Sequence, residues 1–533
     1  MDAISYNLAR SAILRRAEPP YSALVAKDGS TVWAEDTSGK TIASGEAGVD
    51  DASVIQSAGN YALSQNGILK LLGEFTINDN ILFDGGGTKA LSIVGDRFTS
   101  ADHAPQLNIN ADTGITLKRL HGYILRDLSL NGNGANKGIF SDHSILGILE
   151  NVYICNFKQA LDLYRCWETR GHNITISFSG DSETSTPAVI IRDDPSLGTP
   201  QGTSNNIELH FQGGANKYAF VELQGYIERS SIYFEGNEIS SPDDTSTKGI
   251  YVHKSDLGSA KDLRIVLNTS YGAPVVDLNN AAQVEIIGNL SAPPGKGIYM
   301  KNCNRVNVNV NTFHCNNDYD IYAESCGFVN IRGIYHWGYG LYFVSVTGLK
   351  IDAHTSDLKS HHIYLYNCKD VQIKGNFYRS GGRGEAAELL RLYSCHRVSI
   401  DAIFYQEEEG VTTNGILMSN CSYINILNEI YGGYISTNKQ VSNTTFIKNS
   451  GTATFSGDGT TTDLEIGSHG LVITDPSKIA VKVTPASSDA IAASPCVGYV
   501  DPADNTKIRV KFSSAPASGS ENVKIVWYAE VVS

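Results

Sequence analysis

Residues 363–373 read IYLYNCKDVQI, and this pattern decides the fold. The same arrangement of apolar residues recurs between Gly297 and Tyr431, so that six lines can be written under one another. In each line an apolar residue is followed five positions later by a small apolar residue, and by two more apolar residues three and five positions beyond that. The six lines read IYMKNCNRVNV (298–308), IYAESCGFVNI (321–331), LYFVSVTGLKI (341–351), IYLYNCKDVQI (363–373), LRLYSCHRVSI (390–400) and ILMSNCSYINI (416–426).

The spacing within and between these lines predicts strands arranged as a solenoid. Within a line the apolar columns lie two residues apart, which is the period of a β-strand and not of a helix. Successive lines follow at intervals between 20 residues (Cys326 to Val346) and 27 residues (Cys368 to Cys395). One such turn cannot bury its apolar face, but stacked turns about 4.8 Å apart share a continuous core. The sequence therefore predicts a parallel β-solenoid.

Five of the six lines carry Cys in one column, and we expect these thiols to be buried and reduced. A free Cys behaves as a small hydrophobic residue, and parallel Cβ vectors on neighbouring turns suit the disulfide torsion poorly. The nine Cys of the chain are an odd number and show neither a CxxC pair nor a zinc-finger spacing. A disulfide framework and a metal site are therefore both disfavoured. The column consists of Cys303, Cys326, Cys368, Cys395 and Cys421, with Val346 in the third line.

The composition argues against a nucleic-acid-binding protein and against a membrane-spanning one. A formal net charge of −14 at pH 7 argues against a nucleic-acid partner, which would need phosphate neutralisation by Lys and Arg. No apolar run approaches the length that spans a membrane, and the first twenty residues lack the apolar core of a signal peptide. We therefore expect no insertion into a membrane. Either the protein assembles in a cytoplasm or a signal segment has been removed.

The pattern divides the chain into three parts. Residues 1–47 are expected to form a separate segment, with a short helix over Ala3–Arg16 and strands over Tyr21–Gly45 joined by Gly-containing turns. Residues 48–450 are expected to form the solenoid. Residues 451–533 change period and show short strands between tight turns, which predicts a small β-sandwich. This last module resembles C-terminal modules appended to phage structural proteins, and the resemblance implies a role in trimer formation or glycan attachment.

The start of the solenoid has a pattern of its own. Gly48-Val-Asp-Asp51 precedes Ala52–Leu63, where Val54, Ile55, Ala58 and Ala62 give one apolar helical face that Asp50 or Asp51 can cap. A strand and then Gly73-Glu-Phe-Thr-Ile77 follow. This order resembles the opening of pectate-lyase-like β-helices in phage tailspikes and related glycan-degrading proteins. The resemblance covers about thirty residues, and it implies a right-handed parallel β-helix closed at one end by the helix.

The resemblance also implies a polysaccharide partner, a homotrimer, and a place on a virion tail or outside a cell. The aligned lines show where such a partner could bind, because they sort the residues that point outward. Aromatic ladders on a solenoid either stack on sugar rings or bury against a neighbouring subunit. The first strand carries Tyr299, Tyr322, Tyr342 and Tyr364; the third carries Phe313, His336, Ser356, Tyr378, Tyr405 and Tyr431, with Asn311, His354, Asn376 and Glu429 two positions earlier.

Two sets of residues near the third strand fit two ways of cleaving a glycan. Elimination beside a uronate carboxylate needs a base and a cation, and the candidates are His336, His354, Tyr378 and Tyr405 with Arg379 or Arg383. Hydrolysis needs paired carboxylates, and the candidates are Asp357, Glu385, Glu407 and Glu408. Further substrate contacts are expected from Tyr405, Trp337, Arg383 and Tyr431.

The sequence favours a polysaccharide-cleaving, tailspike-like protein, with elimination placed slightly ahead of hydrolysis. The Asn-Thr-Asp and Gly-His-Gly motifs of polygalacturonase-type hydrolases are absent. A non-catalytic receptor-binding fibre is the alternative class, and an acyl esterase would need a Ser-His-Asp cluster that no motif identifies. Asp318 and Asp320 offer oxygen ligands for Ca²⁺, but two carboxylates are too few for a site, so no metal or cofactor is assigned.

Overall fold

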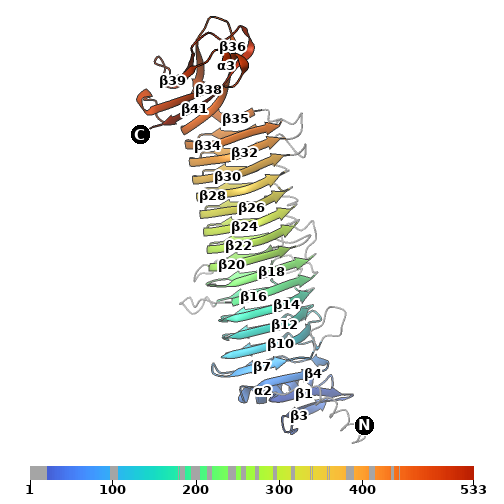
Figure 1. Cartoon of the computed structure of the whole chain (residues 1–533). Helices are drawn as coiled ribbons and strands as arrows, with labels where there is room; N and C mark the ends of the chain where they lie inside the picture. The colour runs from blue at the N-terminus through green and yellow to red at the C-terminus, as the bar shows by residue number, and fades with distance from the viewer. Residues whose placement is uncertain are drawn as a thin grey trace. The chain divides into compact units, whose positions relative to one another are not determined.

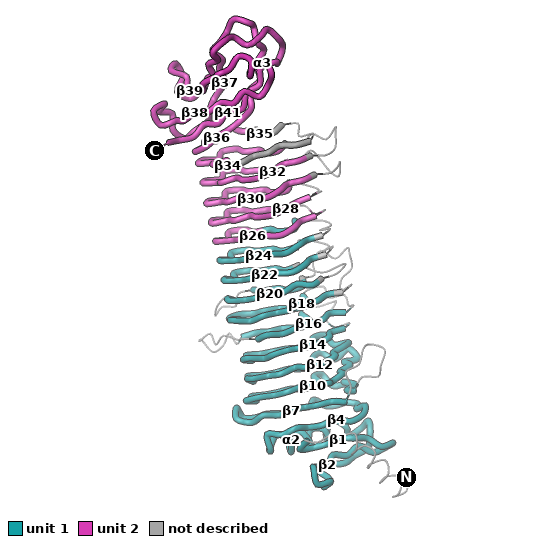
Figure 2. The backbone as a smooth tube through the Cα atoms, viewed as in Figure 1, with its two compact units in different colours: residues 1–322 teal, residues 323–533 magenta. Residues whose placement is uncertain are grey.

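The computed structural model describes most of the chain, in two compact units. Residues 1–322 belong to the first unit and residues 323–533 to the second (Figure 2). In a few strand residues, including Arg379 and Tyr431, only the backbone is described. The described residues are 21–96, 106–177, 179, 186–193, 205–212, 219–237, 248–253, 260–269, 275–291, 297–313, 319–336, 338, 340–356, 358, 361–379, 389–406, 414–433, 437–442 and 444–532.

Each unit contains turns of a parallel β-solenoid (Figure 1). This confirms the predicted right-handed parallel β-helix. Most turns give one long strand to a sheet that we call sheet A and one short strand to a sheet that we call sheet B. Strand β25 (Ile321–Glu324) of sheet B crosses the boundary between the units.

In the first unit the long strands belong to sheet A and the short ones to sheet B. Sheet A contains β4 (Ile68–Leu72), β5 (Phe75–Ile77), β7 (Ala90–Val94), β8 (Leu107–Ile109), β10 (Gly122–Asn131), β12 (Gly147–Cys155), β14 (Thr169–Ser177), β16 (Asn205–Gln212), β18 (Ser231–Asn237), β20 (Lys261–Thr269), β22 (Ala282–Ser291) and β24 (Asn304–Phe313). Sheet B contains β6 (Ile81–Asp84), β9 (Thr113–Lys118), β11 (Lys137–Asp142), β13 (Gln159–Tyr164), β15 (Val189–Arg192), β17 (Ala219–Gln224), β19 (Lys248–His253), β21 (Val275–Asn279) and β23 (Ile298–Lys301).

The second unit repeats this arrangement with strands that follow the predicted lines. Sheet A contains β26 (Gly327–His336), β28 (Thr347–Ser356), β30 (Lys369–Arg379), β32 (His396–Gln406) and β34 (Ser422–Gly433). Sheet B contains β27 (Leu341–Val344), β29 (Ile363–Tyr366), β31 (Leu390–Tyr393), β33 (Asn414–Ser419) and β35 (Thr437–Ser442). Strands of neighbouring turns pair in parallel, for example β28 with β30 and β30 with β32.

The predicted columns lie in the core, and the Cys column begins directly after the corner between the two sheets. All five Cys of the column are buried and free. The residue before each column position has a left-handed backbone, as at Asn367 (φ 54°) and Ser394 (φ 54°). Asn accepts this conformation more readily than most residues, because its short polar side chain hydrogen-bonds to the local backbone. The column therefore marks the turn as well as the core.

The N-terminal part confirms the predicted strands and helix. The strands β1 (Ala23–Asp28), β2 (Thr31–Asp36) and β3 (Thr41–Glu46) are antiparallel neighbours. Helix α2 (Asp51–Ser64) follows, and its predicted apolar face, Val54 to Ala62, is buried. The helix expected over Ala3–Arg16 lies outside the described residues.

The predicted side-chain cap of this helix was wrong. Asp50 holds the N-cap position, but its carboxylate makes no cap hydrogen bond and accepts instead from the Glu46 N–H at 2.8 Å. The buried Asp51 carboxylate accepts from the Gly48 N–H at 2.9 Å and from the Thr76 N–H at 2.6 Å, and it pairs with Lys27. Both carboxylates therefore join neighbouring segments instead of satisfying the helix N–H groups.

The C-terminal part contains antiparallel sheets around a small core, in agreement with the predicted β-sandwich. One sheet pairs β36 (Phe446–Gly457) and β38 (Ile479–Pro485) with β41 (Gly519–Val531). The other pairs β37 (Asp463–Ser468) and β39 (Cys496–Val500) with β40 (Lys507–Phe512). Helix α3 (Ser488–Ala492) adds Ala490 to a core with Val510, Phe512, Val523 and Ile525; a short 3-10 helix, η2, spans Pro476–Lys478. The boundaries at residues 47/48 and 450/451 stay predictions.

Candidate functional site

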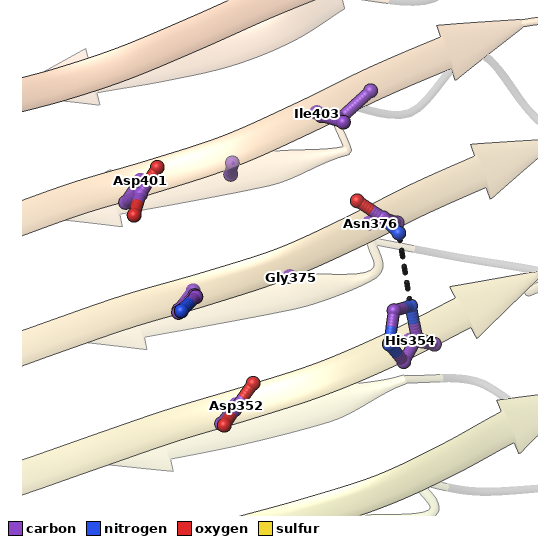
Figure 3. A pocket seen from close by; sticks show the side chains of 8 residues that line it. Asp352, His354, Gly375, Asn376, Asp401 and Ile403 are labelled. Atoms are coloured by element: carbon purple, nitrogen blue, oxygen red, sulfur yellow. Dashed lines mark hydrogen bonds between the residues drawn. The ribbon is translucent and has the colours of Figure 1, made fainter.

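A groove of about 350 Å³ lies on sheet A of the second unit (Figure 3). It crosses β28, β30 and β32, so residues from three successive turns line it. The lining residues are Asp352, His354, Lys374, Gly375, Asn376, Asp401, Ala402 and Ile403.

The strand register places charged residues of alternating sign in one column of this groove. Asp352 lies opposite Lys374, and Lys374 lies opposite Asp401. On the other side of Asp352, Arg332 continues the alternation. Neighbouring strands are about 4.8 Å apart, so the backbones of Asp352 and Asp401 are separated by about 10 Å. The column therefore holds two carboxylates with a cation on the strand between them.

A second column, two residues further along the strands, contains His354, Asn376 and Ile403. The Asn376 side-chain N–H donates to Nδ1 of His354 at 3.1 Å (Figure 3). A neutral imidazole carries one proton, so acceptance at Nδ1 places that proton on Nε2. His354 is exposed, and it therefore offers an N–H donor to a ligand.

Small residues separate the two columns. Gly375 lies between Ala353 and Ala402 in the register and has φ +146°, a conformation that side chains rarely adopt. A Cβ at this position would lie 1.8 Å from the carbonyl oxygen of Ala353. The strands β28 and β30 approach each other closely here, and only Gly allows it.

Some of the predicted site residues lie near each other, and others lie outside the described residues. His354 lines the groove. His336, the last residue of β26, hydrogen-bonds to Ser356. Tyr378 of β30 stacks on Tyr405 with 5.3 Å between centroids and 5° between planes. These residues do not line the groove. Asp357, Trp337, Arg383, Glu385, Glu407 and Glu408 lie outside the described residues, and Arg379 and Tyr431 are described by their backbone alone.

The predicted position of Tyr431 in the Tyr405 column was wrong. Ile400 pairs with Ile426, but the next pair is Asp401 with Asn428, so Leu427 is an extra residue. This β-bulge shifts the rest of β34 by one position and reverses its alternation relative to β32. Tyr405 therefore lies opposite Gly432, while Tyr431 lies opposite Phe404. The same shift places Glu429 opposite Ala402 and not in the column of Asn376.

Three charged residues of the groove were not among the predicted site residues: Asp352, Lys374 and Asp401. Each directly follows the last apolar column, whose members there are Ile351, Ile373 and Ile400. Reading the next outward position of the aligned lines would have revealed a column of alternating charge. Its proximity to His354 depends on the strand register.

The tyrosine ladder of sheet B contains two stacked pairs. Tyr342 and Tyr364 stack with 4.4 Å between centroids and 2° between planes, and the Arg391 guanidinium lies 5.5 Å from the Tyr364 ring centre. Tyr366 and Tyr393 stack with 5.3 Å and 4°. Rings stacked in this way cover each other's faces and leave edges exposed.

A second hollow, of about 410 Å³, lies in the first unit. Amide side chains dominate its lining and bond across turns, as Asn133 does with Asn110 at 3.2 Å. Asp112 is the one carboxylate among its lining residues, so this hollow has no acid pair of its own.

The described residues contain no group of three or more His, Cys, Asp and Glu side chains arranged to hold a metal ion. Asp320, a weak Ca²⁺ candidate, is buried and accepts from the Thr312 hydroxyl at 2.9 Å; Asp318 lies outside the described residues. Among the described helices, none is long and apolar enough to cross a bilayer.

No family model and no curated protein matches the chain. Similar solved structures include the tailspike gp61 of Pseudomonas phage phi297, with 9% identity, 90% of this chain and 92% of that chain covered, and a TM-score of 0.38. They also include a tailspike double mutant of E. coli bacteriophage HK620 in complex with pentasaccharide (12%, 93% and 92%, 0.40). A third is the Azotobacter vinelandii mannuronan C-5 epimerase AlgE6 A-module (14%, 75% and 96%, 0.29).

Proposed function

We propose that the groove on sheet A binds a polysaccharide and hydrolyses it, with Asp352 and Asp401 as the paired carboxylates. The observation that carries this proposal is that both line one groove on strands two apart. Their backbones are about 10 Å apart. Inverting glycosidases hold their two carboxyl groups about 6.5–9.5 Å apart, with room for a water molecule between them. The proposal requires both side chains to lean toward Lys374, which would bring the carboxyl groups into this range.

In this proposal the two carboxyl groups divide the proton transfers. One protonates the glycosidic oxygen as the bond to the leaving sugar breaks, and the other takes a proton from the attacking water. The other polar residues of the groove bind the glycan. The Nε2–H of His354 and the amide of Asn376 hydrogen-bond to sugar hydroxyls, and Lys374 holds the two negative charges close together.

Elimination is the second candidate, because His354 and Lys374 supply an imidazole and a cation in the same groove. It needs a free imidazole nitrogen to remove the proton beside the uronate carboxylate. The bond from Asn376 occupies Nδ1, which leaves the proton on Nε2. Asp352 and Asp401 would also repel a uronate. These two features support hydrolysis over elimination, a reversal of the order favoured by the sequence.

The test is incubation of the full chain with a panel of bacterial capsular polysaccharides and O-antigens. Reducing ends and absorbance in the unsaturated-uronate band are followed together. Hydrolysis predicts new reducing ends without absorbance, and elimination predicts both. Glycan binding with neither signal, on a polysaccharide that the protein retains on a column, would contradict cleavage and favour a non-catalytic receptor-binding fibre.

We also propose that the chain acts as a homotrimer on a virion tail or outside a cell. Two observations support this: the opening pattern from Gly48 to Ile77, which resembles that of tailspike β-helices, and the ring edges exposed on sheet B by Tyr366 and Tyr393. Light scattering on the purified protein tests the trimer against the chain mass of 57.6 kDa. A monomer mass at all protein concentrations would contradict it.

A further inference from the structure

The Tyr405 ring has two faces with different surroundings. Tyr378 covers one face, with 5.3 Å between ring centroids and 5° between the planes. On the other side, the register position of the next strand belongs to Gly432, which has no side chain. Tyr405 is still 38% exposed although one face is stacked. The β-bulge at Leu427 therefore places a glycine, and not a tyrosine, at the register position beside this face of Tyr405.

We propose that the Tyr405 face over Gly432 is a stacking subsite for one pyranose ring of a glycan. The C–H groups on one face of a pyranose make an apolar surface, and an aromatic face of matching size is its usual partner because both bury apolar area without losing hydrogen bonds. The position fits one ring, since Gly432 stands where the regular ladder would have placed Tyr431.

The subsite continues the groove, which is why its occupant is the glycan of the proposed function, on which this inference rests. Ile403 lines the groove and lies two residues before Tyr405 on the same face of β32. Its side chain is 42% exposed. An apolar strip therefore leads from the groove past Ile403 to the Tyr405 ring, and a sugar chain bound at Asp401 reaches Tyr405 with its next residues.

Tyr364 on sheet B provides a matched control. Tyr342 stacks on one face of its ring at 4.4 Å, and the Arg391 guanidinium lies over the ring at 5.5 Å. Tyr364 is thus a tyrosine in the same unit and in the same kind of ladder, but neighbouring side chains cover both faces of its ring. A sugar that stacks on uncovered aromatic faces should bind at Tyr405 and not at Tyr364.

The experiment places 3-fluorotyrosine at position 405, or at position 364, of the full chain and follows the fluorine resonance during titration with methyl β-D-glucopyranoside. The inference predicts a saturable shift at position 405 and none at position 364. Gly432→Phe, which fills the open position with a ring, should abolish the shift at 405. No shift at 405, or a shift that persists unchanged in Gly432→Phe, would overturn the inference.

This readout separates the subsite from the chemistry, because it detects a bound sugar without cleavage. A shift at 405 in a protein that cleaves nothing would retain the subsite and reject the proposed hydrolysis. Cleavage without a shift would support the proposed hydrolysis and reject the subsite. On a polysaccharide that the protein cleaves, Tyr405→Ala should raise KM by about tenfold with little change in kcat, while Tyr405→Phe retains the wild-type KM.

Discussion

Asp352 and Asp401 occupy one register column of sheet A, and Lys374 stands between them on the intervening strand. Opposite charges on directly neighbouring strands attract, so the order Asp-Lys-Asp stabilises both pairs at once. The same order keeps two carboxylates within one groove without placing them side by side. In the proposed function, this pair supplies the two carboxyl groups of an inverting hydrolase.

Replacing either carboxylate should remove cleavage and retain binding. Asp352→Asn and Asp401→Asn should each lower kcat by about 10²- to 10⁴-fold, the usual contribution of a general acid or base. Reducing-end release measures the rate, and retention on immobilised polysaccharide measures binding. Asp370→Asn is the control: this residue is on β30, the strand between those of Asp352 and Asp401, but it pairs with Arg397 and does not line the groove. Wild-type rates in both groove variants would reject the paired-carboxylate mechanism.

Gly375→Ala should lower the thermal unfolding midpoint and distort the groove. The new Cβ would meet the Ala353 carbonyl oxygen at 1.8 Å on a backbone with φ +146°, at a cost on the order of 3 kcal/mol. Gly73→Ala is the comparison, because Gly73 has φ +111° and no atom within 4 Å of an added Cβ. Its cost should be only about 1–2 kcal/mol. Equal midpoints for the two variants in calorimetry would show that the contact with Ala353 is unimportant.

Asp51→Ala should destabilise the N-terminal part much more than Asp50→Ala. The Asp51 carboxylate is buried, accepts from two backbone N–H groups and pairs with Lys27. Breaking a buried charge pair of this kind costs about 3–5 kcal/mol. The Asp50 carboxylate accepts a backbone hydrogen bond from Glu46, and its loss should cost about 1 kcal/mol. Hydrogen exchange of helix α2 reports both, and the reverse ranking would contradict the assigned roles.

Cys395→Val should be tolerated. The column already accommodates Val346, and a volume-conserving apolar replacement usually costs less than about 1.5 kcal/mol. The thiol has no evident acid–base role, since its hydrogen bond with Cys368 and its burial raise the pKa of Cys395 to about 12. Thermal unfolding should show a small shift for Cys395→Val and a large one for Cys395→Asp, which buries a charge. A collapse of the fold in Cys395→Val would mean that the thiol stack has a role beyond packing.

The C-terminal part should lose stability in acid through Asp463. Burial by itself raises the pKa of this carboxyl, but hydrogen bonds from Tyr499 and Arg509 outweigh it, so the pKa lies below the ordinary 3.8. A carboxyl with a lowered folded-state pKa stabilises the fold above pH 3.8, and this contribution is lost as the pH falls through the folded-state pKa.

Arg509→Gln tests this prediction, because it removes the 2.9 Å ion pair with Asp463. The variant should be less stable than the parent at neutral pH and should lose less stability between pH 4 and lower pH, as thermal unfolding at a series of pH values will show. Arg126→Gln, which removes an exposed pair with Glu150, should leave the acid dependence of this part unchanged. Parallel pH curves for Arg509→Gln and the parent would contradict the role of Asp463.

Much of the fold could be predicted because it follows from local alternation. Apolar residues two apart require strands, and a repeat of 20 to 27 residues requires stacked turns to bury them. The Cys column located the core, whereas the left-handed corner at the Asn or Ser before it was seen only in the structure. These signals can be read without knowing which residues of the next turn lie opposite, since every turn repeats the same pattern.

The candidate site depends on which residues of neighbouring strands lie opposite one another, and only the tertiary structure decided this. Leu427 is one extra residue in β34, and the alternation looks regular on each side of it, so nothing local shows that Tyr431 has left the Tyr405 column. The open Tyr405 face and the groove between Asp352 and Asp401 both come from register across strands. Side-chain period is two, so a shift of a single residue exchanges every inward and outward position. The sequence pattern was therefore sufficient for the solenoid, and pairing between turns determined which side chains meet.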